Sequence, residues 1–175
     1  MVGKGSIHIR VVTVTGLLFS LAMVLSFFES FLVGMLALPP GIKLGLSNVV
    51  VLFAMLALGK RSAWLLIVLK AMFAVLTRGA VAGLLSLSGG ICSVFLMGLL
   101  AASPRLAVGY RLLCAAGACA HNLGQILAAA LVIQNRYLLY YLPLLLLAGI
   151  LTGVLTGTVY WVVEPYLRRW KAGAL

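Results

Sequence analysis

Three hydrogen-bonding side chains lie close together inside a long apolar stretch. The segment "CAHNLGQIL", residues 119–127, contains His121, Asn122 and Gln125, and apolar sequence flanks it on both sides. On a helix, His121 and Gln125 share one face, while Asn122 points about 100° away. Such groups bind either a ligand or a neighbouring helix, and an interhelical hydrogen bond typically contributes about 0.6 kcal/mol. Three such groups in five residues favour a binding site, in which Asn122 is the one that can serve the adjacent helix instead.

A lysine occupies the middle of another apolar stretch. Lys70 lies in "LLIVLKAMFAVLTRG", and Arg78 follows it eight residues later. With about 3.6 residues per turn, the two side chains lie about 80° apart, so both can face one cavity. A cation at the bilayer centre costs about 2.5–3.5 kcal/mol, which is tolerated when the side chain faces a cavity or a partner. A functional role for Lys70 is favoured over a structural ion pair or a misplaced span boundary.

Further charged and polar residues lie around the second apolar stretch. Glu29 ends the first stretch, and Lys43 and Asn48 flank the start of the second. We predict that these three residues and Arg78 line the outer mouth of a pocket, where Glu29 pairs with Lys43, Lys70 or Arg78. Positive groups outnumber negative ones there, which predicts a ligand with a carboxylate or phosphate on an aromatic or apolar body.

The composition identifies the class of protein that holds these residues. Of the 175 residues, 65% are hydrophobic and 9% are charged, whereas a soluble domain averages about 25% charged residues. A soluble domain of this size could not bury so much apolar surface. The net charge of +11 does not indicate nucleic-acid binding, because basic residues gather in the cytoplasmic loops of membrane proteins.

The apolar stretches predict an all-α integral membrane protein with one domain, residues 1–175. A spanning helix needs about 20 apolar residues. Placing the N-terminus inside puts most basic residues of the connections on the cytoplasmic side, so both termini are predicted to be cytoplasmic. The six expected spans cover approximately residues 10–28, 44–59, 62–79, 81–102, 112–134 and 141–163.

The first outer connection, residues 29–48, is unusually apolar. It contains "VGMLALPPG", in which Pro39, Pro40 and Gly41 break any helix. A solvated loop would not carry so many apolar side chains. We expect the segment to fold back onto the bundle as a lid or a re-entrant segment.

Small residues recur at intervals of four. Gly149, Gly153 and Gly157 form one stripe on the last span. The first span carries two pairs, which are Gly16 with Ser20 and Ala22 with Ser26. Small side chains let helix backbones approach closely. The stripes therefore predict packing within the bundle or, as the less favoured alternative, docking of another membrane protein.

Several kinds of chemistry lack their residues. The chain has no aspartate, and its only acids are Glu29 and Glu164. It therefore lacks the acidic clusters that hold Mg²⁺ in prenyl-diphosphate synthesis and the acid of a Ser-His-Asp triad. A nucleotide-binding loop is also missing, because Ala54 and Arg61 replace its first glycine and its hydroxyl residue in "AMLALGKRS". We expect no catalytic residues, no metal and no cofactor.

Four motifs resemble a known family. "ES…PPGIKLGLSNVVVL", "LSLSGGICSVFLMGLL", "GACAHNLGQILAA" and "YYLPLLLLAGILTGVLTG" are similar to the Gx transporter family, which is also labelled heptaprenyl diphosphate synthase component I. That family is in turn similar to the substrate-binding S components of energy-coupling factor (ECF) vitamin transporters. The resemblance implies a six-helix protein of a prokaryotic cell membrane, with a pocket near the outer face that is capped by the first outer loop. It also implies a transmembrane coupling protein with two cytoplasmic ATPases as partner, which Gly16, Ser20, Ala22 and Ser26 would help to dock.

The favoured function is therefore a substrate-binding membrane subunit for uptake of a small anionic vitamin, quinone precursor or isoprenoid-type molecule. Lys70, His121, Asn122 and Gln125 would contact the substrate, with Asn48, Glu29, Lys43 and Arg78 at the mouth. Two alternatives stay open. One is a non-transporting accessory subunit of a prenyl diphosphate or quinone enzyme, and the other is a secondary carrier that works alone.

Overall fold

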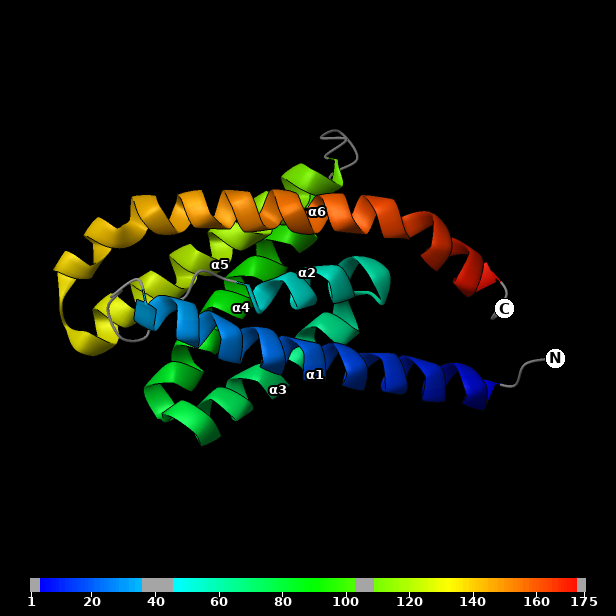
Figure 1. The fold of residues 1–175 in the computed structure, drawn as a ribbon, viewed down its shortest axis with the longest axis horizontal. Coiled ribbons are helices and arrows are strands. Elements are labelled where there is room, and N and C mark those ends of the chain that lie inside the picture. Colours follow the sequence, from blue (N-terminus) through cyan, green and yellow to red (C-terminus); the bar gives the residue numbers. More distant parts are fainter. Residues whose placement is uncertain (1–3, 36–45, 103–108, 173–175) are drawn as a thin grey trace.

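The computed structural model describes residues 4–35, 46–102 and 109–172, and every regular element in these ranges is a helix (Figure 1). In chain order the elements are α1 (Lys4–Met35), α2 (Asn48–Ala57), α3 (Lys60–Arg78), α4 (Ala80–Ala102), α5 (Tyr110–Ile133), the 3₁₀ helix η2 (Arg136–Tyr141) and α6 (Leu142–Ala172). The predicted all-helical class is confirmed for these ranges.

Four helices are long and apolar enough to cross a membrane, which indicates a membrane protein. These segments are Val11–Leu32, Ala80–Ala102, Tyr110–Ile133 and Arg136–Tyr166. Helix α2 has ten residues and is therefore about 15 Å long, half the thickness of a hydrocarbon core. Helix α3 has nineteen residues but carries four basic side chains, which lower its hydropathy.

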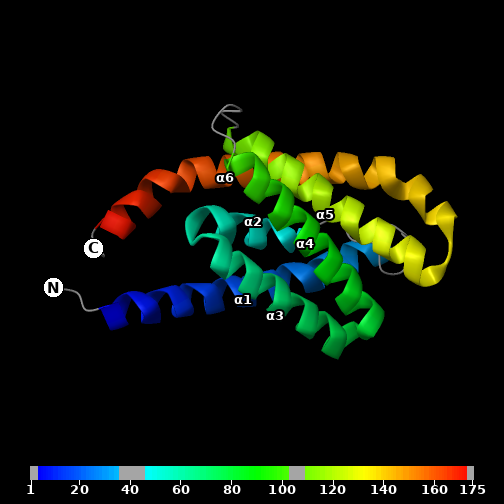
Figure 2. The ribbon, with the colours of Figure 1, turned by 180° about the vertical axis from the view of Figure 1, so that it is seen from behind.

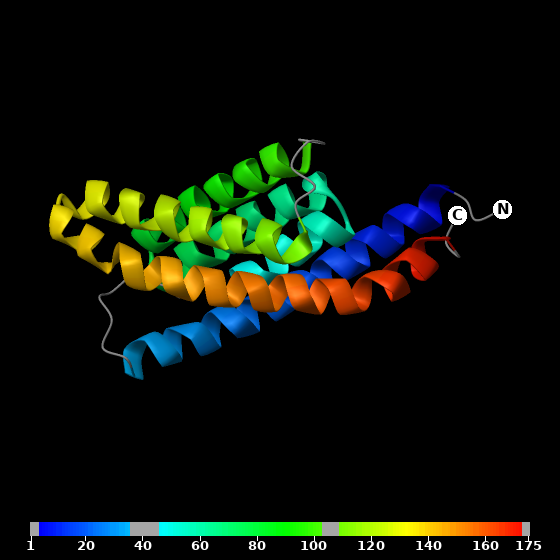
Figure 3. The same cartoon turned by 90° about the horizontal axis from the view of Figure 1, so that it is seen from above.

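The helices form an elongated bundle. Helix α1 begins and α6 ends at the same end of the molecule, and the opposite view in Figure 2 agrees. Helix α2 lies between α1 and α6 and contacts both. Seen from above, the axes of α1 and α6 cross obliquely (Figure 3), while α5 and α6 run side by side as an antiparallel pair.

Glycines bring α5 and α6 into backbone contact. A Cβ atom on Gly149 would stand 3.2 Å from the backbone nitrogen of Cys119, and one on Gly157 would stand 2.5 Å from the Cα of Arg111. A Cβ on Gly153 would collide with the Cα of Ala115. The glycine stripe therefore packs within this bundle, which is the favoured of its two predicted roles.

The first helix is longer than predicted. It continues through Glu29 to Met35, so the expected end at residue 28 is wrong. No proline interrupts the chain before Pro39, so the sequence contains no helix-breaking residue of that kind up to Met35. Of the predicted lid, only residues 33–35 are described and they are helical; Lys43 and the rest of the lid lie outside the described residues.

The small residues of α1 fall on two different faces. Ala22 and Ser26 are buried inside the chain, which leaves only Gly16 and Ser20 on the exposed face. The outer surface of α1 is otherwise strongly apolar, and Phe27 is 81% exposed. A docking surface on α1 stays a prediction, now carried by Gly16 and Ser20 alone.

The apolar core lies where α2 meets α3, α4 and α5. Its fully buried members include Leu52, Leu66, Met97 and Cys114. A tight turn at Gly79, whose φ is 90°, joins α3 to α4. Because α2 is packed against these three helices, the start of this short helix lies inside the bundle.

Candidate functional site

A carboxylate from α1 binds the start of α2. Glu29 is fully buried; its Oε1 accepts a hydrogen bond from the Leu46 N–H at 3.2 Å. Its Oε2 accepts from the N–H and the hydroxyl of Ser47, at 3.5 and 3.3 Å. The N-terminus of a helix has unpaired N–H groups and a partial positive charge, so it attracts an anion. Glu29 is thus an interior residue, which corrects its predicted position at an exposed mouth.

Lys70 faces the interior from α3. It is 6% exposed and shares its helix face with the buried residues Ile67 and Ala74. The charges of Glu29 and Arg78 act on it. Among the described residues it makes no hydrogen bond and no ion pair within 4 Å. The structure therefore places a buried ammonium group near one acid and one other cation, without a direct partner in those ranges.

Arg78 ends α3 and reaches α1. Its Nη2 donates a hydrogen bond of 3.4 Å to the Ser26 hydroxyl, and the charge of Glu29 also acts on it. A cation is favourable at this position because the C-terminus of a helix is partially negative. The charged groups of Glu29, Lys70 and Arg78 thus lie near enough to influence one another, while the pairing of Glu29 with one of the cations stays a prediction.

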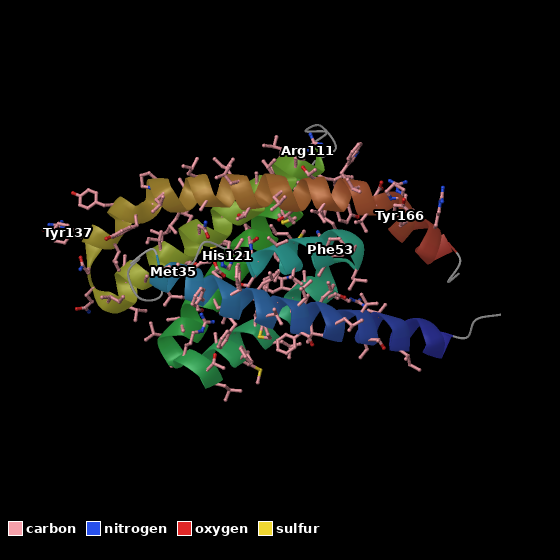
Figure 4. The ribbon with its side chains drawn as sticks, viewed as in Figure 1. Met35, Phe53, Arg111, His121, Tyr137 and Tyr166 are labelled. Carbon is pink, nitrogen blue, oxygen red and sulfur yellow. The ribbon has the colours of Figure 1, made fainter. Side chains whose placement is uncertain are left out.

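The polar residues of α5 are all buried. His121, Asn122 and Gln125 are 3%, 1% and 4% exposed, and His121 lies in the middle of the bundle (Figure 4). Asn122 donates from Nδ2 to the Leu145 carbonyl of α6 at 2.6 Å. It therefore serves the adjacent helix, which was the alternative predicted for it, while His121 and Gln125 share the other face.

Gly89 on α4 gives His121 its place. A Cβ on Gly89 would stand 2.8 Å from the imidazole Cε1, closer than real Cβ atoms approach. Any larger residue at Gly89 would therefore displace the imidazole or separate α4 from α5. The close approach of His121 thus explains the first glycine of the "SLSGG" motif.

Two further buried polar side chains have no hydrogen-bond partner among the described residues. Asn48, the first residue of α2, is 1% exposed, and neither its Oδ1 nor its Nδ2 is bonded. Ser93 on α4 is fully buried, and its hydroxyl is also unbonded. Buried polar atoms are nearly always satisfied in folded proteins, by protein groups, water or a ligand. These atoms are available to a bound molecule.

Ser93 was missed by the sequence-based prediction. It lies four residues after Gly89 and so shares its face, which is directed at α5. That spacing is the signal that could have identified it. Asn48 was predicted, and it lies beside the group that Glu29 binds.

The second acid lies at the other end of the bundle. Glu164 accepts hydrogen bonds from the Tyr110 hydroxyl, at 3.3 Å, and from Arg168. Nearby, the Tyr160 hydroxyl donates to the Leu56 carbonyl of α2 at 3.1 Å. Among the described residues, no three His, Cys, Asp or Glu side chains gather in a group that could hold a metal ion.

Comparison with known proteins gives one match. A family model described as "Heptaprenyl diphosphate synthase component I" matches residues 18–162. The match covers most of the chain and includes the described candidate residues from Glu29 to Gln125. No curated protein and no solved structure matches.

Proposed function

The chain belongs to the heptaprenyl diphosphate synthase component I family, and from that premise we propose that it is a membrane subunit that binds and does not transform its ligand. The ligand is a small molecule with an anionic group on an apolar or aromatic body. The chain delivers it across the membrane with the help of partner proteins, as the S components of ECF transporters do.

The observation that carries this proposal is the state of Lys70. A buried ammonium group is costly in an apolar environment unless a partner offsets the cost. Lys70 lacks a direct partner in the described part of the chain, and the unbonded amide of Asn48 lies next to the residues that Glu29 binds. A carboxylate or phosphate between these groups would satisfy both.

The α5 residues supply the rest of the proposed contacts. His121 and Gln125 face the interior and would bind polar atoms of the ligand, and Ser93 would add a hydroxyl. Asn122 is occupied by the Leu145 carbonyl, so we assign it to helix packing and not to the ligand.

The family description favours a second candidate, an accessory subunit of a prenyl diphosphate synthase. Synthesis of that kind needs Mg²⁺ held by several carboxylates. Here Glu29 binds the start of α2, and Glu164 binds Tyr110 and Arg168. Among the described residues, neither acid belongs to a cluster of side chains that could hold a metal ion. In this candidate the catalytic carboxylates therefore belong to another subunit.

For the topology we propose six spans with both termini in the cytoplasm. Because α1 begins and α6 ends at the same end of the molecule, the chain must cross the membrane an even number of times. Helix α3 is about 28 Å long by its rise, and α2 starts inside the bundle and covers half a bilayer. Helices broken at membrane depth are found where the irregular backbone lines a binding site.

Transport needs a partner in this proposal, because the chain has no nucleotide-binding loop. We propose a transmembrane coupling protein with two cytoplasmic ATPases. The exposed small residues Gly16 and Ser20 on α1 would let its helices approach closely. ATP hydrolysis by the partner would then reorient the loaded subunit.

The test is to purify the chain in detergent and to identify co-purified small molecules by mass spectrometry. Lys70→Ala should abolish both the co-purified ligand and the uptake in cells. Lys60→Ala is the matched control, because Lys60 is exposed at the start of the same helix, and it should change neither. Transport is refuted if no small molecule stabilises the wild-type chain and Lys70→Ala leaves uptake unchanged.

A pull-down separates the two candidates. The accessory subunit should capture a soluble synthase and bind no small molecule. Uptake into liposomes by the chain alone, without ATPases, would instead identify a secondary carrier.

A further inference from the structure

A crevice between α1 and α3 opens on the apolar surface of the bundle. Its volume is about 240 Å³, and it is lined by Ser26, Phe27, Ser30, Phe73, Thr77 and Arg78. Typical pockets for drug-sized ligands have about 300–1,000 Å³. The crevice therefore suits a narrow molecule, such as one chain with a small head group.

The polar groups of the crevice favour an anion. The hydroxyls of Ser30 and Thr77 donate to the backbone carbonyls of Ser26 and Phe73, at 2.9 and 2.8 Å, so their protons are already used. Arg78 has five N–H donors, of which one bonds the Ser26 hydroxyl. The guanidinium therefore provides the hydrogen-bond donors that an incoming molecule would meet.

The nearby acid does not compete for Arg78 by hydrogen bonding in the described contacts. Glu29 lies one helical turn after Ser26, and its two oxygens accept from Leu46 and Ser47. Its charge acts on both Arg78 and Lys70. The crevice thus adjoins the interior group that contains Lys70.

The walls of the crevice are apolar and face the surface. Phe27 is 81% exposed, and Leu76, next to the crevice on α3, is 83% exposed. In a bilayer such side chains contact lipid chains.

We propose that this crevice receives a single-chain amphiphile with a carboxylate or phosphate head directly from the bilayer. The head binds Arg78, and the chain lies along Phe27 and Phe73. This inference rests on the proposed function, because the crevice would give the ligand of that function a lateral route from the lipid towards Lys70. It makes Arg78 the residue that selects anionic heads.

The experiment measures binding of dodecyl phosphate to the full chain in a maltoside detergent by isothermal titration calorimetry. Arg78→Gln should weaken binding by at least about tenfold, which corresponds to about 1.4 kcal/mol. Arg78→Lys should retain part of the affinity, because it keeps the charge but not the fork of donors. Arg136→Gln is the matched control, since Arg136 is another exposed arginine, on η2, and it should bind like the wild type.

Three results of the binding measurements would overturn the inference. Equal weakening by Arg78→Gln and Arg136→Gln would show a general effect of surface charge. Equal binding of dodecanol would show that no anionic head is selected, and inorganic phosphate binding as tightly as dodecyl phosphate would show that the apolar wall contributes nothing. A fourth result separates the two proposals: if Arg78→Gln binds dodecyl phosphate normally while Lys70→Ala does not, the role of the crevice is refuted and the proposed function stands. Conversely, the proposed function fails if no ligand co-purifies with the chain or if its binding does not depend on Lys70.

Discussion

Glu29 on α1 binds Ser47 through both its backbone N–H and its hydroxyl, across 18 residues of sequence. The contact joins two helices inside an apolar bundle and satisfies the beginning of α2. It also holds the acid near Lys70, whose charge it partly balances.

Replacing this acid should destabilise the bundle. Glu29→Ala removes the acceptor for Leu46 and Ser47, and we expect a loss of about 1–3 kcal/mol because buried donors then lack a partner. Chemical unfolding in detergent, followed by tryptophan fluorescence, measures it. Glu164→Ala is the control; its carboxylate bonds the exposed Arg168, so the loss should be smaller. The opposite order would contradict the role assigned to Glu29.

Replacing Lys70 should have the opposite effect on stability. Lys70→Met keeps the length of the side chain and removes a buried charge. We expect the unfolding free energy to rise by less than the cost of about 2.5–3.5 kcal/mol for an uncompensated cation, because Glu29 already offsets part of the Lys70 charge. Ligand binding should be lost in the same variant. Lys60→Met, at the exposed start of α3, should show neither change. A large loss of stability in Lys70→Met would identify a structural ion pair instead of a binding residue.

Substitutions of Asn122 and His121 should distinguish a role in helix packing from a role in ligand binding. Asn122→Ala removes the hydrogen bond to Leu145 and should lower the free energy of unfolding by about 0.6–1.7 kcal/mol without weakening ligand binding. His121→Ala should weaken the ligand more than it changes stability. Thermal unfolding and a binding titration on the same samples compare them, with the lipid-facing Leu123→Ala as control. Loss of ligand in Asn122→Ala would return that residue to the binding site.

The glycine stripe of α6 should be sensitive to one methyl group. Gly153→Ala places a Cβ against the Cα of Ala115 and should cost about 1–3 kcal/mol, because α5 and α6 must separate. Gly16→Ala places its Cβ in open space and should be neutral, or stabilising by up to about 1 kcal/mol, since alanine favours the helix. Equal effects in unfolding measurements would mean that the α5–α6 contact is not tight in solution.

Helix positions were largely predictable from the apolar pattern. The expected spans 81–102 and 112–134 agree closely with Ala80–Ala102 and Tyr110–Ile133, because glycine and charged residues bound these stretches. The end of α1 was not predictable in the same way. Glu29 resembles a terminal residue by its charge, but the neighbouring α2 gives it partners inside the bundle, so the helix continues past it.

Several residues of the candidate site were recognisable in the sequence, although Ser93 was missed, whereas their contacts were not predictable. Lys70, His121 and Asn48 were recognisable because polar residues are rare in apolar stretches. The bond between Glu29 and Ser47 and the contact of Gly89 with His121 join residues from different helices. Helix periodicity contains no information on which helices become neighbours, so these relationships required the structure.

The position of Glu29 also has a consequence for how the protein is made. Helix α3 carries Lys70 and is not among the helices that are long and apolar enough to cross a membrane, whereas α1 contains such a segment, Val11–Leu32. On the proposed six-span topology, the acid that offsets this lysine is already in the membrane when α3 leaves the ribosome. The order of synthesis thus supplies a counter-ion before the cation that needs it, and insertion of α3 becomes a cooperative step with a helix translated earlier.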